Sequence, residues 1–209
     1  MVAVVTAENR SAFAGTITQM HRDRKAVFVD ALKWEIPVVD DAFEIDEYDT
    51  EAAVYLVAQE PLSGAHLGSV RLVCTAGPHL LGDKFAFLCA DAVPTGDDVW
   101  EITRLCTTPG LTPAAALQVR MRLVMALMEY ALAHGIARYT MMTHTAYLPT
   151  LLAVGWDIEP LGLPADVAGQ PTGALQISVN AAALDRLRTL YGFRAPVIGA
   201  SDARSAVAA

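Results

Sequence analysis

Four carboxylates stand close together just before an apolar run of the chain. They are Glu44, Asp46, Glu47 and Asp49, and the stretch AAVYLVAQ follows them. A run of charges most often lies in a solvated loop. A pair of carboxylates can instead hold an ammonium or sulfonium cation where water is partly excluded. The segment is therefore either an exposed loop or part of a site for a cationic ligand, and the charges alone leave both interpretations open.

Three arginines in apolar surroundings are candidate partners for these acids. Arg24 lies one helical turn before Phe28, so the two side chains can share a helix face. Arg71, within SVRLVCT, and Arg104, within WEITRLC, lie in apolar segments where an unpaired charge is costly. Each arginine alone could form a plain structural ion pair. Together they predict one network of bidentate guanidinium–carboxylate contacts, and networks of this kind tend to mark sites.

A further carboxylate lies inside the segment VWEITRLCTT, which reads as a strand. Strand alternation places Glu101 and Thr103 on one face, and Ile102 and Arg104 on the other. A buried carboxylate can act as a general base, or it can order a water that does so. The alternative for Glu101 is a role as a salt-bridge partner.

Several apolar side chains could line a ligand pocket. Phe28 and Trp34 could wall an adenine or a methylthio group, although core packing is the commoner role of aromatic residues. Methionines such as Met125 and Met142 are most often core filler, but they also line adaptable apolar pockets. The segment TTPGLTPAAAL leads into a helix without the Q/R-x-x-G-x-G/A run that holds pyrophosphate in common acyl-CoA-dependent N-acetyltransferases. This counts against an ordinary acetyl-CoA enzyme.

Composition limits the class of protein. The 209 residues are 54% hydrophobic and 18% charged, which favours one globular domain with a large core. A net charge of −8 argues against nucleic acid and anionic membranes as partners. No apolar run is long enough for a bilayer span, and the N-terminus has no basic start or cleavage site of a signal peptide. The three cysteines, Cys74, Cys89 and Cys106, are expected to be buried thiols of a cytoplasmic protein, and no Cys/His cluster has metal-ligand spacing.

The order of the elements predicts an α/β fold. Thr112 is a natural N-cap, Pro113 suits the first helical position and Gly135 ends the clearest helix. We expect a single domain, residues 1–209, as a three-layer α/β/α sandwich with a mixed sheet, with a flexible helical segment over 1–35 and a frayed tail over 201–209. The expected helices are 10–34, 112–135 and 147–155, and the expected strands are 52–59, 67–75, 99–108, 137–144 and 173–180.

Five sequence blocks together resemble the acyl-homoserine-lactone synthases, the family that makes the autoinducers of bacterial quorum sensing. RKAVFVDALKW resembles the family's Arg-x-x-x-Phe-x-x-x-x-x-Trp signature, and EIDEYD resembles its Glu-x-Asp-x-x-Asp segment. GSVRLVCTAGPHLLGDKFAFL resembles its Gly-x-x-Arg-Leu-x-Pro-Thr block, and VWEITRLCT its Trp-Glu-x-Ser-Arg-Phe strand. TMMTHTAYLPTLLAVGWDIEPLG resembles the family's late strand, helix and Gly-Trp turn.

The resemblance implies a fold similar to the N-acetyltransferase superfamily and two substrates. These are S-adenosylmethionine and an acyl thioester on acyl carrier protein or coenzyme A, with no further cofactor and no metal. The amine of S-adenosylmethionine attacks the thioester, a lactone closes, and methylthioadenosine leaves. The resemblance implies Glu101, Arg104 and Thr103 as catalytic residues, with Glu101 as the base directly or through a water. It implies these residues for S-adenosylmethionine: Arg24, Phe28, Trp34, Asp46, Asp49, Arg71 and Arg104.

The chain departs from the family's pattern at three positions. Leu105 replaces a phenylalanine, Thr103 a serine and Cys74 a proline, and a smaller residue at 105 could widen the acyl tunnel. Thr143 lies near a threonine that the family tends to carry in makers of 3-oxo-acyl products. The expected acyl pocket consists of Leu105, Met125, Met142, Thr143 and Leu152.

Other expectations concern the carrier and the rival functions. An acidic enzyme that uses an acidic carrier protein needs a local basic patch, and Arg120 and Arg122 are the candidates, with a solvated helix face as the alternative. Two other functions remain open from the residues alone. One is an N-acyltransferase of the same fold that acts on a different amine, and the other is a non-catalytic acyl-binding sensor.

Overall fold

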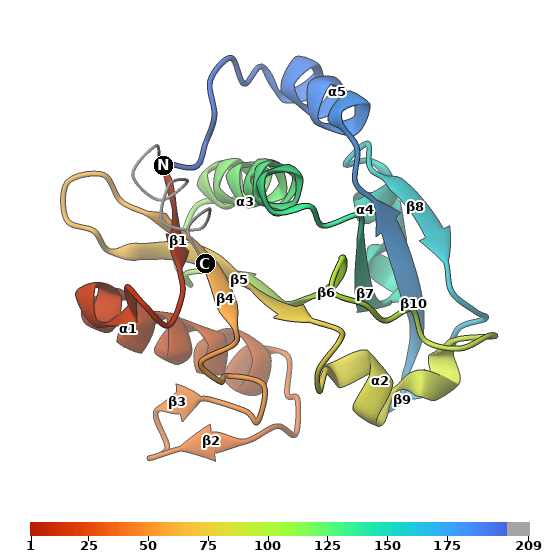
Figure 1. Cartoon of the computed structure of the whole chain (residues 1–209). Helices are drawn as coiled ribbons and strands as arrows, with labels where there is room; N and C mark the ends of the chain where they lie inside the picture. Colours follow the sequence, from red (N-terminus) through yellow and green to blue (C-terminus); the bar gives the residue numbers. More distant parts are fainter. Residues whose placement is uncertain (200–209) are drawn as a thin grey trace. The chain divides into compact units, whose positions relative to one another are not determined.

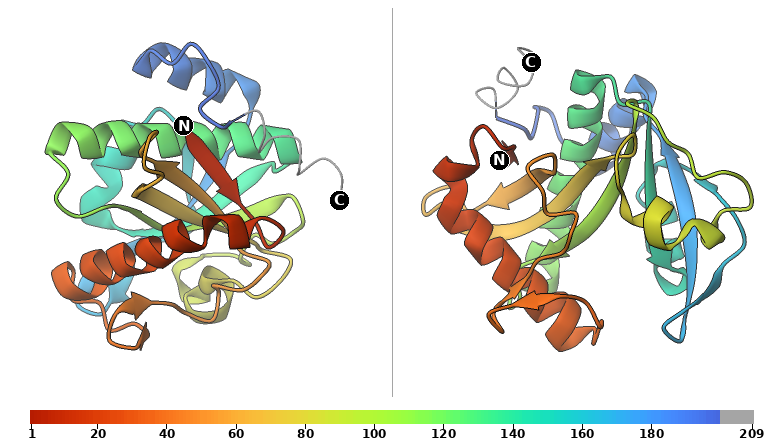
Figure 2. Two further views of the ribbon diagram at one scale, coloured as in Figure 1. Left: turned by 90° about the vertical axis from the view of Figure 1, so that its left-hand side faces the viewer. Right: turned by 60° about the horizontal axis from the view of Figure 1, so that its bottom comes forward.

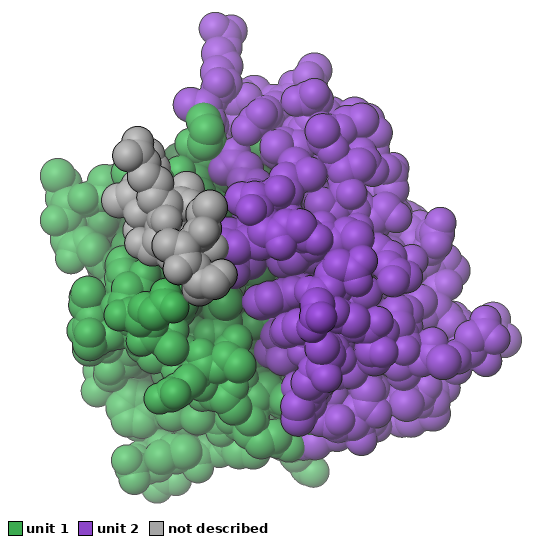
Figure 3. Space-filling model, in the orientation of Figure 1, with its two compact units in different colours: residues 1–72, 104–127, 196–209 green, residues 73–103, 128–195 purple. Residues whose placement is uncertain are grey.

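The computed structural model describes residues 1–199, and these fall into two compact units (Figure 3). Of the described residues, the first unit comprises 1–72, 104–127 and 196–199, and the second comprises 73–103 and 128–195. The predicted frayed tail, 201–209, lies outside the described residues. Each unit combines helices with strands, so the α/β class is confirmed (Figure 1).

The first unit is built on three antiparallel strands. In this unit β1 pairs with β4, and β4 pairs with β5. The elements that contribute to the unit are β1 (Val2–Val5), a 3-10 turn (Arg10–Phe13), α1 (Ala14–Arg24), a π-helical turn (Lys25–Ala31), β2 (Val38–Val39), β3 (Phe43–Glu44), β4 (Val54–Gln59), β5 (His66–Cys74), β6 (Val99–Thr107) and α3 (Pro113–His134).

The N-terminal segment differs from its expected helical character. It opens with β1, whose four residues are between 0 and 8% exposed and pair along β4. The prediction of a purely helical segment over 1–35 is therefore wrong at its start, because VAVV is a short β-branched run that finds a strand partner about fifty residues away. The helix predicted over 10–34 is confirmed in outline, and α1 continues into the π-helical turn as one helical rod (Figure 2).

A small core holds α1 against the strands of the first unit. Met20 on α1 is fully buried and packs with Val5 of β1 and with Tyr55 and Val57 of β4. The apolar face of α1 therefore ends just before its polar C-terminal turn, which carries Arg24.

The second unit contains a mixed sheet, as predicted. In this unit β6 runs parallel to β7, with Val99–Glu101 paired to Arg138–Thr140. The central strand β10 is antiparallel to β7, β8 and β9. The elements that contribute to the unit are α2 (Leu80–Lys84), a 3-10 turn (Ala86–Leu88), β6, α3, β7 (Arg138–His144), a 3-10 turn (Thr145–Tyr147), α4 (Leu148–Leu152), β8 (Asp157–Pro160), β9 (Ala165–Val167), β10 (Gln170–Ser178) and α5 (Ala181–Tyr191).

Two long helices follow their local capping signals. The Thr112 hydroxyl accepts the Ala115 N–H at 3.3 Å, and Gly135 ends α3 with a φ of +68°. Both predicted caps are thus confirmed. The sequence analysis missed α5, although Asn180 caps its start and Gly192 ends it in the left-handed region.

The second unit has an apolar cluster of its own. Leu81 and Leu88 from the α2 segment are fully buried against Ala174 of β10. We refer to this group of side chains as the apolar cluster. Its partly buried members are Phe85, Cys89, Val93, Met142, Leu161, Ala165 and Val167.

The cysteines are free thiols, but only one is fully buried. Burial raises the pKa of Cys106 to about 12, which keeps it protonated near neutral pH. Cys74 and Cys89 are half-buried, so the expectation of three buried thiols is wrong for these two. Within residues 1–199, no helix is long and apolar enough to cross a membrane.

Gly68 marks a close approach inside the first unit. A Cβ atom there would lie 2.7 Å from Val119 Cγ1 and 2.9 Å from the Cys106 carbonyl oxygen. We therefore predict that Gly68→Ala destabilises the protein by about 1–3 kcal/mol through overpacking. Urea denaturation followed by tryptophan fluorescence measures the change. Gly77→Ala is the control, because a Cβ atom there meets nothing within 4 Å. Equal midpoints for the two variants would contradict the packing argument.

Candidate functional site

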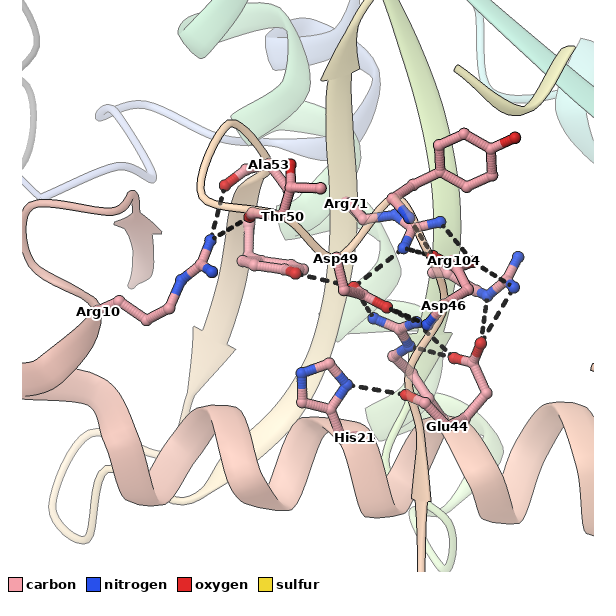
Figure 4. Close-up of polar contacts among 12 residues, drawn as sticks. Arg10, His21, Glu44, Asp46, Asp49, Thr50, Ala53, Arg71 and Arg104 are labelled. Atoms are coloured by element: carbon pink, nitrogen blue, oxygen red, sulfur yellow. Dashed lines mark hydrogen bonds and ion pairs between the residues drawn. The ribbon is translucent and has the colours of Figure 1, made fainter. Parts of the chain in front are cut away.

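Three arginines and three carboxylates converge in the first unit (Figure 4). The structure thus brings together the arginines that the sequence singled out. All six side chains are between 0 and 7% exposed. We call this group the ion-pair network, and it consists of Arg24, Arg71, Arg104, Glu44, Asp46 and Asp49.

Arg24 joins α1 to the acidic segment. Its Nε lies 2.5 Å from Oε2 of Glu44, and its Nη1 and Nη2 lie 2.7 and 2.8 Å from the two oxygens of Asp49. The contact with Asp49 is bidentate, which is the strongest geometry for this pair of groups. Phe28 is 4% exposed and lies one turn further, as the shared helix face predicted.

Asp46 is shared by the other two arginines. Arg71 binds it with Nη1 at 2.5 Å and Nη2 at 3.0 Å. Arg104 binds the same carboxylate with Nη2 at 2.7 Å and reaches Glu44 with Nε at 3.1 Å. Because each carboxylate contacts two arginines, the predicted connected network is present rather than three separate pairs.

The network keeps its groups charged despite their burial. Burial alone would raise the pKa of Asp49, but the hydrogen bonds and charge of Arg24, followed by the charge of Arg71, hold it well below its usual range. The pKa of Asp46 is lowered in the same way, with Arg71 as the main opposing cause to burial. Asp49 and Glu44 likewise raise the pKa of Arg24 against the effect of burial.

This arrangement decides between the interpretations of the acidic segment. The solvated-loop interpretation is wrong for Glu44, Asp46 and Asp49, whose side chains are 0, 3 and 2% exposed. It holds for Glu47, which is exposed. Since the three buried acids are matched by three arginines, they act by holding guanidinium groups in place rather than by offering a bare anionic site.

A second layer supports Asp49. The Tyr55 hydroxyl donates to Asp49 Oδ1 at 2.8 Å, and the Arg10 guanidinium lies 5.2 Å from the centre of the Tyr55 ring. Arg10 Nη2 also donates to the carbonyl oxygens of Thr50 and Ala53, each at 3.0 Å, directly beyond the acidic segment (Figure 4). The sequence analysis missed Arg10 and Tyr55, because a tyrosine in a strand and an arginine before a helix carry no signal of their own.

Asp23, the residue before Arg24, anchors α1 from its other side. His66 Nδ1 lies 2.6 Å from Asp23 Oδ2, Thr108 donates to the same oxygen, and Gln19 Nε2 donates to Oδ1 at 2.8 Å. Burial would raise the pKa of Asp23, but these bonds, that of His66 first, lower it. Asp23 and Arg24, which are adjacent on α1, therefore together fix the orientation of the helix that directs Arg24 toward the acids.

Arg104 has an unusual backbone for a residue inside a strand. Its φ is +51°, in the left-handed region, where a residue other than glycine costs on the order of 1–3 kcal/mol. This interrupts the alternation on which the predicted faces of β6 rested. The ion pairs to Glu44 and Asp46 hold the side chain in place against that strain.

The predicted aromatic wall is present, but its rings contact each other. Phe28 and Trp34 stack with centroids 4.8 Å apart and planes 20° apart. The Arg104 guanidinium lies 5.7 Å from the centre of the Phe28 ring. Their role against an adenine or a methylthio group stays a prediction.

Glu101 lies in the second unit and is 0% exposed. Its Oε2 accepts the Leu80 N–H at 2.9 Å, and its Oε1 accepts the Leu81 N–H at 2.7 Å. Thr140 lies level with Glu101 on β7, and its buried hydroxyl has no hydrogen-bond partner among the described residues. Thr103, the other predicted catalytic residue of this unit, is 8% exposed.

The predicted acyl-pocket residues are not equally supported. Met142 belongs to the apolar cluster, while Leu105 and Thr143 are half-buried and Met125 is a fully buried core side chain of α3. Leu152 is 58% exposed and lies outside that cluster, and its role in an acyl pocket stays a prediction. The short helix α4 turns this side chain toward solvent.

Two other predictions concern the docking of a carrier protein and the binding of a metal ion. Arg120 and Arg122 are half-buried on α3, which leaves the docking role untested. Within residues 1–199, no group of three or more His, Cys, Asp or Glu side chains could hold a metal ion.

Comparison with known proteins identifies relatives over most of the chain. The family model described as "Autoinducer synthase" matches residues 9–187. The isovaleryl-homoserine lactone synthase of Bradyrhizobium diazoefficiens is 31% identical over 193 residues, covering 92% of this chain and 86% of that protein. The structure of BjaI, a CoA-dependent acyl-homoserine lactone synthase with SAM and isopentyl-CoA, aligns with a TM-score of 0.88 at 29% identity, over 95% of this chain and 92% of that one.

A more distant likeness concerns the fold alone. An N-acetyltransferase-like protein from Lactobacillus plantarum aligns with a TM-score of 0.55 at 18% identity, over 86% of this chain and 99% of that one. The predicted likeness to the N-acetyltransferase fold is thereby confirmed.

The ion-pair network makes a prediction about stability. Asp49→Asn removes the charge opposite Arg24 and places an NH2 group against its guanidinium, so a buried cation loses a main partner. We predict a loss of about 3–5 kcal/mol in the free energy of unfolding. Chemical denaturation measures it, with Glu51→Gln as a matched control because Glu51 is exposed two residues away. If Glu51→Gln loses as much stability as Asp49→Asn, the predicted contribution of the Asp49–Arg24 ion pair is contradicted.

Proposed function

This chain belongs to the autoinducer synthase family and is an acyl-homoserine-lactone synthase, and from this premise we propose that its ion-pair network binds S-adenosylmethionine. The other two functions, an acyltransferase for a different amine and a non-catalytic sensor, are set aside because the relatives over most of the chain are synthases.

The reaction exchanges one acyl bond and then closes a ring. The amine nitrogen of S-adenosylmethionine attacks the thioester carbonyl, a C–N bond forms and the C–S bond breaks. The amine gives up a proton and the departing thiolate gains one. The methionyl carboxylate then attacks its own γ-carbon, the C–S bond to the sulfonium breaks, and methylthioadenosine leaves as a neutral molecule. Ring closure needs orientation above all, because the sulfonium is already a good leaving group.

One observation carries the assignment of the network to S-adenosylmethionine. Arg104 uses Nε and Nη2 for Glu44 and Asp46, and its Nη1 makes no hydrogen bond to the described residues. Its side chain is also 7% exposed, against 1% for Arg24 and 0% for Arg71. A guanidinium held rigidly by two acids, with one donor left over, suits the methionyl carboxylate.

The remaining site residues follow from this position. Phe28 and Trp34 form an aromatic stack beside Arg104, and aromatic faces attract a sulfonium as they attract other cations. The network itself supplies no net charge, because its three acids and three arginines balance. It therefore orients the substrate through individual N–H donors rather than attracting it through a net charge.

The attacking amine needs little help to become neutral. An α-amine with a pKa of about 7.7–8.0 is roughly half deprotonated at pH 8. The demand on a catalytic base is correspondingly small, and most of the rate is expected from bringing amine and thioester together.

We further propose acyl-CoA as the donor, since BjaI is CoA-dependent and aligns over 95% of this chain. The location in the cytoplasm, where both substrates are made, is a proposal that rests on the free cysteines.

Arg104→Lys tests the substrate site. Lysine keeps the charge but loses the fork that reaches two acids and the substrate at once, so kcat/KM for S-adenosylmethionine should fall at least about 100-fold. Mass spectrometry of methylthioadenosine and acyl-homoserine lactone measures it. Arg186→Lys is the matched control and should stay near wild type, because Arg186 pairs with Asp157 at the surface. Wild-type protein that releases no methylthioadenosine with any acyl thioester would overturn the proposed function.

The donor is tested with one acyl group on two carriers. Wild-type kcat/KM is predicted to be at least about tenfold higher with acyl-CoA than with the same acyl group on acyl carrier protein. A preference for the carrier protein would overturn the CoA proposal. In that case the double variant R120E/R122E should raise KM for the protein-borne donor alone, and equal effects on both donors would refute the predicted docking role.

A further inference from the structure

Glu101 is engaged by backbone groups at both of its carboxylate oxygens. The oxygens accept the N–H groups of Leu80 and Leu81 at 2.9 and 2.7 Å, and the side chain is completely buried. Leu80 and Leu81 are the first two residues of α2. The first N–H groups of a helix have no partner within the helix, so a carboxylate from a neighbouring strand satisfies them.

This geometry suits a residue that holds the start of α2 in place, which we call the fastening role. Hydrogen bonds with an ionised acceptor are stronger than neutral ones, and two of them in parallel fix direction as well as distance. Glu101 itself stands on a firm support, because it ends the paired stretch of β6 and β7. A general base must instead turn an oxygen toward the proton that it takes. Here each oxygen already accepts one N–H bond, so the carboxylate cannot turn without breaking a bond to α2.

The segment that Glu101 holds, α2, forms one side of the apolar cluster, and we call it the α2 wall. Leu81, whose N–H donates the shorter bond, is 0% exposed and packs with Ala174 and Met142. Phe85 from the end of α2 packs against the same group. Moving α2 would therefore move two of the cluster's side chains together.

The segment is also packed closely on itself. A Cβ atom on Gly82 would lie 2.6 Å from the His79 ring. That ring is held in turn by a 2.9 Å contact from Nδ1 to the Gly77 carbonyl oxygen. These contacts give the start of α2 a defined shape, and the two hydrogen bonds that Glu101 accepts tie it to β6.

We infer that Glu101 is a positioning residue that fixes the α2 wall of the apolar cluster and thereby sets which acyl chains the enzyme accepts. The inference rests on the proposed function and adds one step, that the acyl chain lies against the apolar cluster, which includes the predicted acyl-pocket residue Met142. It revises the sequence-based assignment of Glu101 as the base. The amine proton then passes to solvent water or to the departing thiolate, without Glu101.

The test is Glu101→Gln, assayed with acyl donors of different chain length across a range of pH. The amide keeps the shape but turns an NH2 group toward one backbone N–H. We expect kcat/KM for the best donor to fall about 10- to 100-fold. The ratio of kcat/KM between donors should shift at least about fivefold. KM for S-adenosylmethionine and the inflection of the pH profile should stay as in wild type.

Hydrogen exchange gives a second readout that does not depend on activity. The amides of Leu80 and Leu81 should exchange at least about tenfold faster in the variant, because one loses its acceptor and the other exchanges a charged acceptor for a neutral one. Leu81→Ala reaches the same wall without touching the carboxylate, and it should shift the donor ratio while keeping the pH profile. Asp83→Asn is the control, since it removes an exposed charge from the same helix.

Three outcomes separate the explanations. A loss of about 1,000-fold that is equal for all donors, with the rising limb of the pH profile gone and amide exchange unchanged, makes Glu101 the base and overturns the inference. A shifted donor ratio with faster exchange supports it. If the wild type turns over no donor, the proposed function fails, while faster exchange at Leu80 and Leu81 still supports the fastening role.

Discussion

The pairing of three buried guanidinium groups with three buried carboxylates is the constraint on which the first unit depends. Removing a charge from water is costly, and attraction between partners offsets that cost only when the contacts are close and complete. Here they lie between 2.5 and 3.1 Å. Such a network adds little net stability, yet the loss of one partner leaves a buried charge uncompensated. Its six members therefore position α1, β5, β6 and the acidic segment against one another.

Two departures from regular backbone serve this network. The helix that carries Arg24 ends in a π-helical turn, which places Phe28 beside Arg104. Arg104 itself adopts a left-handed φ of +51° within β6. Both features cost free energy locally, and both occur beside the network that we propose binds S-adenosylmethionine; strain of this kind tends to persist at functional sites.

Buried carboxylates have two different uses in this protein. Glu44, Asp46 and Asp49 face guanidinium groups and orient charged donors. Glu101 faces backbone N–H groups and orients an element, α2, together with the apolar side chains that it carries. The partner, rather than the residue type, decides whether a buried acid orients a charged side chain or a backbone segment.

The sequence by itself determined the features that depend on near neighbours or on a known order of motifs. These include the caps of α3 at Thr112 and Gly135, the shared helix face of Arg24 and Phe28, and the family, which the spacing of the motifs indicated. Tertiary structure alone decided which groups meet. Glu44 and Arg104 are 60 residues apart, and Glu101 is about 20 residues from the amides that it holds. It also decided that β1 is a strand and that Leu152 faces solvent. Contacts at such separations depend on how the whole chain packs, and no local periodicity records them.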